Sequence, residues 1–294
     1  MELHQIRYFL AVVEARNFTR AAERCNVSQP ALTKAIKKLE AELDGPLLHR
    51  DRSGPKLTTL GELVLPRLAR LAEDSTSVLT IAGNYRLLKN VPLRVGVLRT
   101  IGPAQLAAHF EAFRQRAPAV ELELQVLDEE ALLVGLEEAT LDLAVTNPDV
   151  ETRDWMVVRE LYTERYVAVL PPAHPLAEQE TVGMPQLAGE RYIDRLACEL
   201  RETLRSICAE IGFELYATHS TAHEAWVECL VRAGVGLALL PEFSIASKET
   251  ESRLLVDPSV TRRIALLRSV EHPSSPAAKL LWETMLEGAQ PAAP

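Results

Sequence analysis

The sequence predicts a multidomain protein in which a small all-α head precedes a larger α/β body. At 294 residues the chain is longer than one typical domain, so we expect two or three compact units. Apolar residues repeat at helical spacing through the beginning of the chain. Farther on, strand-like runs alternate with helical ones, as in an α/β fold. The expected units are the head (residues 1–60), a linking helix (61–90) and the body (91–294).

The composition excludes several classes of protein. Hydrophobic residues make up 47% and charged residues 25%, which predicts an ordinary soluble globular protein. No apolar stretch is long enough to cross a bilayer, so we expect a cytoplasmic protein with no membrane partner. The four cysteines form no C-x-x-C pair, which argues against structural zinc or a disulfide scaffold. Since no P-loop or dinucleotide fingerprint is present, we expect neither a metal nor a cofactor.

Charge is distributed unevenly along the chain. The net charge is -9, yet residues 1–60 hold ten Lys or Arg against seven Asp or Glu, a balance of +3 that leaves -12 for the rest. A mildly basic head on an acidic body predicts that the head contacts DNA while phosphate repels the body.

Three short helices are predicted in the head. The first carries Ile6, Phe9, Leu10 and Val13 at helical spacing, and the second carries Phe18, Ala21, Ala22 and Cys25. Asn17 and Ser28 are expected to cap the second and third helices by accepting from their first N–H groups. Pro30 fits the first turn of the third helix, where a missing N–H is tolerated.

The third helix has the chemistry of a recognition helix. Its expected buried stripe is Leu32, Ile36, Leu39 and Leu43. Its polar side carries Gln29, Pro30, Thr33, Lys34 and Lys37. Glutamine pairs with adenine, threonine bonds to base edges and lysine reaches guanine or phosphate, so this side suits the major groove. The alternative interpretation is a solvated helix in a three-helix bundle.

A basic turn-rich segment follows, at residues 49–56, and reads as a short hairpin or wing. Its Arg50, Arg52 and Lys56 are expected to hold backbone phosphates or to enter the minor groove.

These segments together resemble the DNA-binding domain of the LysR family of bacterial transcription regulators. The resemblance is carried, in order and spacing, by residues 17–22, 27–33, 36, 39–40, 47–50 and 57–61. Leu48 and Leu60 stand where the family usually has Phe and Ala. The resemblance implies a winged helix-turn-helix in which Thr19, Arg20 and Ser28 join the DNA-contacting set, with duplex operator DNA as the partner.

A heptad pattern marks the linking helix. Val64, Leu68, Leu71, Ser75, Val78, Ala82 and Tyr85 alternate spacings of four and three. A lone helix lying on its own domain would show the same pattern, but the family resemblance implies dimerisation, as a dimer or a dimer of dimers. Pro66 lies in the opening turns, where we expect it to delay or kink the helix.

The body is expected to contain largely parallel strands alternating with helices. Strand-like runs occupy residues 93–98, 121–126, 142–145, 166–170, 191–194, 236–240 and 263–267. This rhythm does not distinguish one sheet from two. Residues 141–145, 174–177 and 232–241 resemble LysR effector-domain segments, which implies two lobes similar to periplasmic solute-binding proteins. The expected lobes are residues 91–161 with 262–290, and residues 162–261.

A small-molecule effector is expected in the cleft between the lobes, beyond the carboxyl ends of parallel strands. Candidate effector residues are Thr100, Ile101, Gly102, Thr146, Asn147, Cys198, Arg201 and Thr221. Arg201 would pair with a carboxylate effector, although such an arginine is also a common surface ion-pair partner.

Two cysteines leave a redox alternative open. Cys198 and Cys208 lie where the peroxide-sensing branch of the LysR family has its sensing pair, but they are one residue farther apart, and Glu199 directly follows Cys198. An acidified thiolate near Arg201 would be oxidisable, whereas buried cysteines are commonly inert. The leading hypothesis is a sequence-specific regulator controlled by an effector, which contacts RNA polymerase if it activates transcription. A solute-binding or enzymatic α/β protein is the remote alternative, because no catalytic motif is present.

Overall fold

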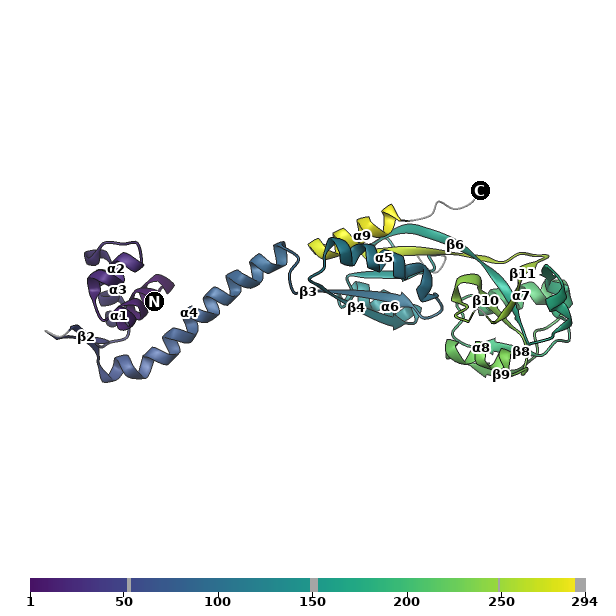
Figure 1. Cartoon of the computed structure of the whole chain (residues 1–294), viewed down its shortest axis with the longest axis horizontal. Helices are drawn as coiled ribbons and strands as arrows, with labels where there is room; N and C mark the ends of the chain where they lie inside the picture. The colour runs from purple at the N-terminus through teal and green to yellow at the C-terminus, as the bar shows by residue number, and fades with distance from the viewer. Residues whose placement is uncertain (52–53, 149–152, 248, 289–294) are drawn as a thin grey trace. The chain divides into compact units, whose positions relative to one another are not determined.

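A computed structural model describes residues 1–51, 54–148, 153–247 and 249–288 of the chain, with residues 50 and 51 described by their backbone alone. The chain divides into two compact units, Met1–Leu87 and Leu88–Pro294. Each unit is described separately below, and Figure 1 labels many of their helices and strands.

The first unit contains the predicted head. Its helices are α1 (Leu3–Ala15), α2 (Phe18–Arg24), α3 (Gln29–Glu42) and α4 (Thr59–Arg86). A short antiparallel hairpin, β1 (Leu48–Asp51) and β2 (Gly54–Leu57), lies between α3 and α4, which confirms the predicted wing. The predicted caps are confirmed as well, since the Asn17 side chain accepts from the N–H groups of Thr19 and Arg20 and Ser28 accepts from Ala31.

The predicted apolar stripes form the core of this unit. Phe9, Leu32 and Leu39 are completely buried in one hydrophobic cluster. Leu43, expected in the same stripe, lies at the end of α3 and is only partly buried. Because packing of this kind fixes which side of α3 faces inward, it also fixes which side faces outward.

Helix α4 differs from its prediction at its beginning. It begins at Thr59, where the Thr58 hydroxyl accepts from the Gly61 N–H, and it continues through Pro66. The expectation that Pro66 delays the helix is therefore wrong, because the Thr58 cap starts α4 before the proline is reached. The heptad residues behave in two ways: Leu68 is buried in the head's core, whereas Leu71, Val78 and Tyr85 are exposed.

The second unit is the α/β body. Its strands are β3 (Val91–Leu98), β4 (Val120–Leu127), β5 (Leu143–Thr146), β6 (Met156–Leu170), β7 (Thr181–Gly183), β8 (Tyr192–Arg195), β9 (Ala217–Thr221), β10 (Ala238–Pro241), β11 (Glu251–Val256) and β12 (Thr261–Ser269). Its α-helices are α5 (Pro103–Arg116), α6 (Glu129–Glu137), α7 (Arg201–Ile211), α8 (Glu224–Arg232) and α9 (Pro276–Glu287). Three short 3-10 helices complete it: η1 (Pro175–Glu178), η2 (Met184–Leu187) and η3 (Glu242–Ser244).

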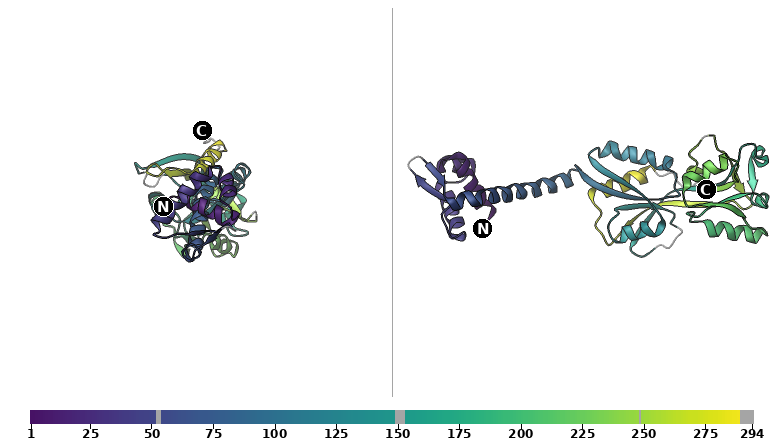
Figure 2. Two further views of the ribbon diagram at one scale, coloured as in Figure 1. Left: turned by 90° about the vertical axis from the view of Figure 1, so that its left-hand side faces the viewer. Right: turned by 90° about the horizontal axis from the view of Figure 1, so that it is seen from below.

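Two lobes are joined by long strands. The strand order β4-β3-β5-β12-β6-β11-β7, with β10 also beside β6, runs through both lobes, and β8 pairs with β9. Strand β6 pairs with β12 up to Arg165 and with β10 and β11 from Tyr166 onward. Figures 1 and 2 show β6 and β12 running from one lobe into the other. The first lobe packs around Leu93, Leu143 and Ile264, and the second around Tyr166 and Leu239.

The prediction of largely parallel strands is only partly correct. Strand β3 is parallel to β4 and β5, and β8 is parallel to β9, as expected. However, β12 is antiparallel to β5 and β6, and β6 is antiparallel to β10 and β11. The reason is that the chain crosses between lobes twice, in opposite directions, on neighbouring strands. Strand β9 was not among the predicted runs; Thr221 is its last residue, and the following helix begins at Glu224.

Candidate functional site

The recognition side of α3 is exposed. Gln29, Pro30, Lys34 and Lys37 have exposed side chains, and Thr33 is half-buried. The Gln29 amide donates to the Thr33 hydroxyl at 3.4 Å, which aligns two hydrogen-bonding groups along the first turn of the helix. The cap on Ser28 begins α3 at Gln29, so these side chains project from its N-terminal part.

The lysines of α3 are not equivalent. Lys38 donates to the Glu2 carboxylate at 2.8 Å, and this hydrogen bond and charge hold the pKa of Glu2 below its ordinary value. Within the described part of the chain, Lys34 and Lys37 form no ion pair. Lys38 therefore connects α3 to the start of α1, whereas Lys34 and Lys37 remain available for an external anion.

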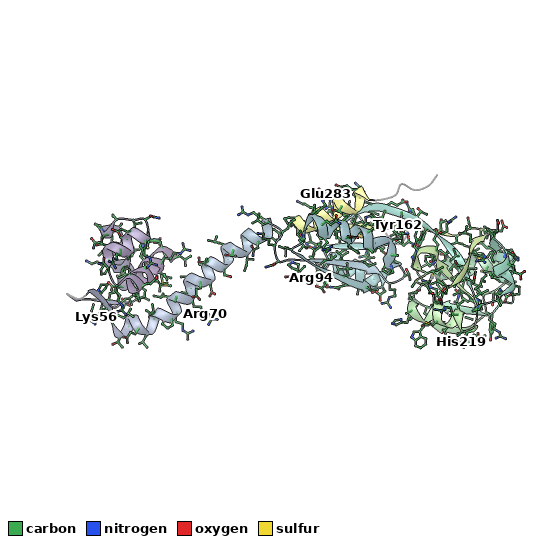
Figure 3. The ribbon with its side chains drawn as sticks, viewed as in Figure 1. Lys56, Arg70, Arg94, Tyr162, His219 and Glu283 are labelled. Carbon is green, nitrogen blue, oxygen red and sulfur yellow. The ribbon has the colours of Figure 1, made fainter. Side chains whose placement is uncertain are left out.

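The other DNA-contact candidates surround α3 in the sequence. Thr19 and Arg20 are exposed at the beginning of α2. Lys56 is exposed on β2 of the wing, where Figure 3 labels it. Arg52 and the Arg50 side chain lie outside the described residues, so their part in the wing stays a prediction.

In the body, two candidate effector residues meet at one edge of the sheet. Thr100 follows β3 and Thr146 ends β5, and these strands are parallel, with Val97 beside Val145. Both threonine side chains are buried, as are Ile101 and Asn147. The Thr146 hydroxyl has no hydrogen-bond partner among the described residues. The strand-end rule thus brings two separate segments together as expected.

A buried arginine lies at this edge, which the sequence analysis missed. Arg262 on β12 has a fully buried side chain. It donates from Nε to Glu164 at 2.8 Å, from Nη1 to the Thr100 hydroxyl at 2.8 Å and from Nη2 to the Thr100 carbonyl at 2.8 Å. Glu164 lies opposite Arg262 on β6. Nη1 also donates to Glu199, which comes from the loop before α7. The cluster therefore joins the crossing strands to both lobes.

Burial and charge oppose each other in this cluster. Burial raises the pKa of Glu164 above its ordinary value, although Arg262 counteracts the shift. Burial alone would lower the pKa of Arg262, but Glu199 and Glu164 together raise it. Removing Arg262 would leave buried carboxylates without their counter-ion, which is strongly unfavourable.

The two lobes also contact each other through the backbone carbonyl groups of Thr100 and Phe243. The Ser244 hydroxyl of η3 donates to the Thr100 carbonyl at 2.9 Å. A Cβ added at Gly102 would collide with the carbonyl oxygen of Phe243. At Gly102, a predicted effector residue, the first lobe's loop therefore approaches the second lobe too closely for a side chain to fit.

The remaining candidates lie in the second lobe. Arg201 donates from Nε to both Asp194 oxygens, at 2.9 and 3.1 Å, and its Nη1 donates to Glu202 at 3.0 Å. These bonds agree with the alternative interpretation of Arg201 as an ion-pair partner of neighbouring carboxylates. The Thr221 hydroxyl accepts from the His223 N–H at 3.0 Å.

Both redox candidates are buried free thiols. Burial raises the pKa of Cys198, with Arg195 opposing, and burial also raises the pKa of Cys208. The Cys198 sulfur lies 3.5 Å from the Tyr166 hydroxyl. Because the thiolate is the reactive form, these thiols are weak nucleophiles in this conformation.

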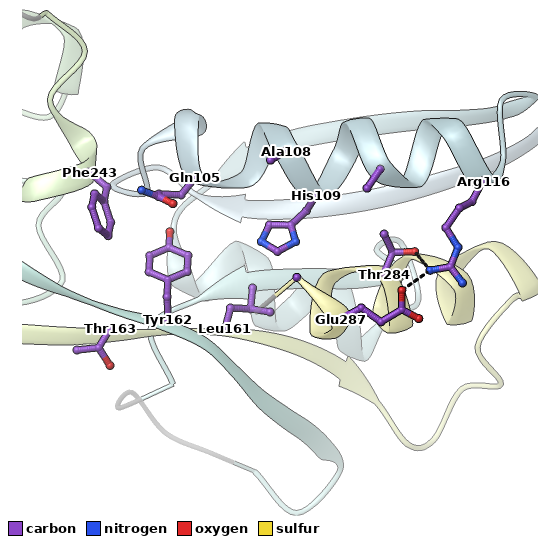
Figure 4. Close-up of a pocket in the computed structure, with 12 residues that line it drawn as sticks. Gln105, Ala108, His109, Arg116, Leu161, Tyr162, Thr163, Phe243, Thr284 and Glu287 are labelled. Atoms are coloured by element: carbon purple, nitrogen blue, oxygen red, sulfur yellow. Dashed lines mark hydrogen bonds and ion pairs between the residues drawn. The ribbon is translucent and has the colours of Figure 1, made fainter. Parts of the chain in front are cut away.

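A cavity of about 410 Å³ opens beside the crossing strand, lined by α5, β6, η3 and the end of α9. Figure 4 shows Tyr162 pointing toward α5 near Gln105 and His109, with Arg116 bonded to Thr284 and Glu287 at the other end. The Tyr162 hydroxyl has no hydrogen-bond partner among the described residues, and burial raises its pKa. Burial lowers the pKa of His109. The sequence did not indicate this cavity, since its residues come from distant segments.

The missed cluster left only a faint trace in the sequence. Glu164 and Arg262 stand at the two places where the chain was expected to cross between lobes, and each has polar or charged neighbours on both sides. One crossing carries an acidic residue and the other a basic one, but no local pattern in the sequence shows that these two side chains pair. In the described ranges, no helix is long and apolar enough to cross a membrane, and no cluster of His, Cys, Asp and Glu could hold a metal ion.

Comparison with known proteins agrees with this architecture. Residues 3–62 match the model for the bacterial regulatory helix-turn-helix protein, lysR family, and residues 89–290 match the LysR substrate binding domain. The chain is 28% identical over 286 residues to the probable nitrogen assimilation transcriptional activator of Synechococcus elongatus, covering 95% of this chain and 92% of the relative. It is 28% identical over 282 residues to the hydrogen peroxide-inducible genes activator of Escherichia coli O6:H1, covering 94% and 91%.

A solved structure shows the same fold. Full-length CbnR in complex with its target DNA matches with a TM-score of 0.70 at 21% identity, covering 99% of this chain and all of the other. Because the two LysR family models together cover most of the chain, the protein is a DNA-binding transcription regulator with an effector-binding domain, not an enzyme. It belongs to the LysR family.

Proposed function

We propose that this regulator recognises its operator through the exposed side of α3, with α2 and the wing holding the phosphate backbone. The observation that carries this proposal is the exposure of Gln29, Lys34 and Lys37 on a helix whose opposite side is locked in the core. Thr33 adds a hydroxyl beside Gln29. Thr19, Arg20, Ser28, Pro30, Arg50, Arg52 and Lys56 complete the proposed interface.

A gel shift on the DNA upstream of its own gene tests this interface. Gln29→Ala should weaken binding to the specific site by about 1–3 kcal/mol, because a bidentate base contact is lost. Binding to unrelated DNA is the internal control and should change little. Equal weakening on both DNAs would assign Gln29 to backbone contact rather than base recognition.

We also propose that α4 pairs two copies of the chain. The exposed Leu71, Val78 and Tyr85 repeat every seventh residue, the period of a coiled-coil seam. A dimer or a dimer of dimers places two heads on a palindromic site. Such a regulator works in the bacterial cytoplasm, where it contacts RNA polymerase if it activates transcription.

The effector site is proposed at the lobe junction around Thr100, Gly102, Thr146 and Asn147. These residues lie at strand ends next to strands shared by both lobes, so a ligand there would bias the lobe arrangement. Ile101, Cys198, Arg201 and Thr221 complete the candidate set. A screen of small metabolites for a raised melting temperature tests this proposal, because a ligand of the folded state stabilises it.

Oxidation of Cys198 and Cys208 is the second candidate signal. Relatives named as hydrogen peroxide-inducible activators favour it, as does the contact of Cys198 with the Tyr166 hydroxyl. Burial of both thiols argues against it. The test compares mass after peroxide treatment, and inducer response in cells, between the wild type and Cys198→Ser. A Cys198→Ser variant that still responds to its inducer rules out this signal.

A further inference from the structure

Arg262 is a buried cation at the lobe junction that could attract an anion, but its donors are already occupied. A guanidinium has five N–H donors. Nε and Nη2 both lie 2.8 Å from Glu164, and Nη2 also donates to the Thr100 carbonyl. Nη1 donates to both the Thr100 hydroxyl and Glu199. A carboxylate entering the junction would therefore have to displace a partner.

Among the partners of Arg262, Glu199 occupies the position that the carboxylate of a bound small molecule would take. It belongs to neither crossing strand, since it lies in the loop between β8 and α7 of the second lobe. One carboxylate oxygen accepts from Arg262, and the other accepts from the Thr100 hydroxyl of the first lobe at 2.8 Å. Its side chain is only 4% exposed. Arginine is the side chain that proteins most often use to recognise a carboxylate, so Glu199 lies where the carboxylate of a small organic acid could bind.

The charges oppose a further anion. Arg262 supplies one positive charge, whereas Glu164 and Glu199, both fully or almost fully buried, supply two carboxylates. Burial raises the pKa of Glu164 above its ordinary value, Arg262 opposes this rise, and the charge of Glu199 adds a smaller contribution to it. Another buried anion would add repulsion and desolvation without a free counter-ion.

We propose that Glu199 is a built-in anionic occupant of the effector site that determines its specificity, by closing the Arg262–Thr100 centre to carboxylates and restricting the junction to neutral or cationic effectors. The inference rests on the proposed function of the junction as the effector site. Glu199 would then differ from a purely structural ion-pair partner, because an external carboxylate should be able to take the place of its side chain.

Replacement by acetate is the test. In the full chain, Glu199→Ala opens a carboxylate-sized space beside Arg262 and Thr100. Its melting temperature should rise by about 3 °C, saturably, when about 100 mM sodium chloride is exchanged for sodium acetate at equal ionic strength. Wild type and Glu199→Gln, in which the space stays filled, should show no such difference. Glu202→Ala is the matched control, because Glu202 is exposed and contacts Arg201.

Two results would overturn the proposal. One is a folded Glu199→Ala variant whose melting temperature is the same in acetate and chloride. The other is saturable binding of acetate, succinate or benzoate to the wild type in titration calorimetry that Arg262→Met abolishes. If Glu199→Ala lacks a cooperative unfolding transition, the titration of the wild type with these carboxylates tests the proposal by itself.

The outcome is separable from the proposed function. Acetate replacement reports only on the Arg262–Thr100 centre, whereas the effector proposal depends on whether a metabolite changes DNA binding. A regulator whose effector binds elsewhere would still show acetate replacement in Glu199→Ala, but its response to that effector would be unaffected by Thr146→Val.

Discussion

Arg262 compensates more buried negative charge than any other side chain described above. Its substitution by methionine would leave Glu164 and Glu199 buried without a counter-ion. We expect Arg262→Met to lower the free energy of unfolding of the body by about 3–5 kcal/mol, as for other broken buried pairs. Denaturant unfolding of the full chain measures the change.

The neighbouring residue provides the control. Arg263 has a half-exposed side chain whose nitrogen lies 3.9 Å from Glu160. Arg263→Met should change the free energy of unfolding by no more than about 0.5 kcal/mol, because surface pairs contribute little. Equal losses in both variants would mean that the buried cluster is not the source of stability.

His109 predicts a pH dependence of stability. Burial lowers the pKa of the folded imidazole below its ordinary 6.5, so the unfolded chain binds this proton more tightly. The stability contribution is complete above pH 6.5 and is lost as the pH falls below it toward the folded pKa. Melting temperatures between pH 8 and pH 5.5 should therefore fall less in His109→Gln than in the wild type.

An exposed histidine tests whether this effect is specific. His219 lies on β9, where Figure 3 labels it. The melting curve of His219→Gln against pH should run parallel to that of the wild type. A flattened curve in His219→Gln, or an unchanged one in His109→Gln, would contradict the assignment.

Individual residues were predictable where one element decided their environment. The caps Asn17 and Ser28 depend only on local backbone geometry, and both were predicted correctly. Glu164, Glu199 and Arg262 come from three separate elements, so no local pattern could show that they share one ion-pair cluster. Arg201 shows the same limit, because its partner Asp194 is fixed by the β8–α7 connection and not by spacing.

Among the elements, α3 has the clearest division of labour. Lys34→Ala should reduce the slope of log affinity against log salt by about 1. The variant would make one phosphate contact fewer, so its binding would release fewer counter-ions from the DNA. Lys38→Ala is the control on the same helix, since Lys38 is bound to Glu2. Titrations of operator DNA by fluorescence anisotropy across salt concentrations supply the slopes, and equal slopes for Lys34→Ala and the wild type would refute the phosphate contact.

The loop after β3 controls how closely the lobes meet. Gly102→Ala would place a methyl group against the Phe243 carbonyl, so we expect a loss of about 1–3 kcal/mol in the free energy of unfolding. Gly83→Ala makes the matched comparison, because nothing lies within 4 Å of its Cβ on α4. That change should stabilise by about 0.5–1 kcal/mol. Calorimetry of the two variants should give shifts of opposite sign.

Elements with strong periodicity were predicted well, and short or polar ones were not. The head helices and β3 have clear apolar patterns, and each was found. Strand β9 was missed because its sequence, ATHST, is mostly polar and its side chains are largely exposed. The first half of β6 was missed because Glu160, Glu164 and Arg165 interrupt its apolar pattern. The burial of Glu164 and its pairing with Arg262 depend on β12, which lies far away in the sequence.

For the whole molecule, the remaining question is which side of α4 meets a second copy. Exposure alone does not answer it, because Val78 and Leu79 are exposed to nearly the same degree, 63% and 66%. Only Val78 continues the spacing of seven that joins Leu71 to Tyr85. Val78→Glu should therefore convert the dimer to a monomer in sedimentation velocity, whereas Leu79→Glu should leave the dimer intact.

The same pair of variants connects assembly with DNA binding. A monomer presents one head to a two-fold site, so Val78→Glu should weaken operator binding while an isolated half-site is bound as by the wild type. Leu79→Glu adds the same charge one residue away and controls for repulsion from phosphate. If Leu79→Glu dissociates the chain and Val78→Glu does not, the seam lies on the other side of α4 and the heptad assignment is wrong.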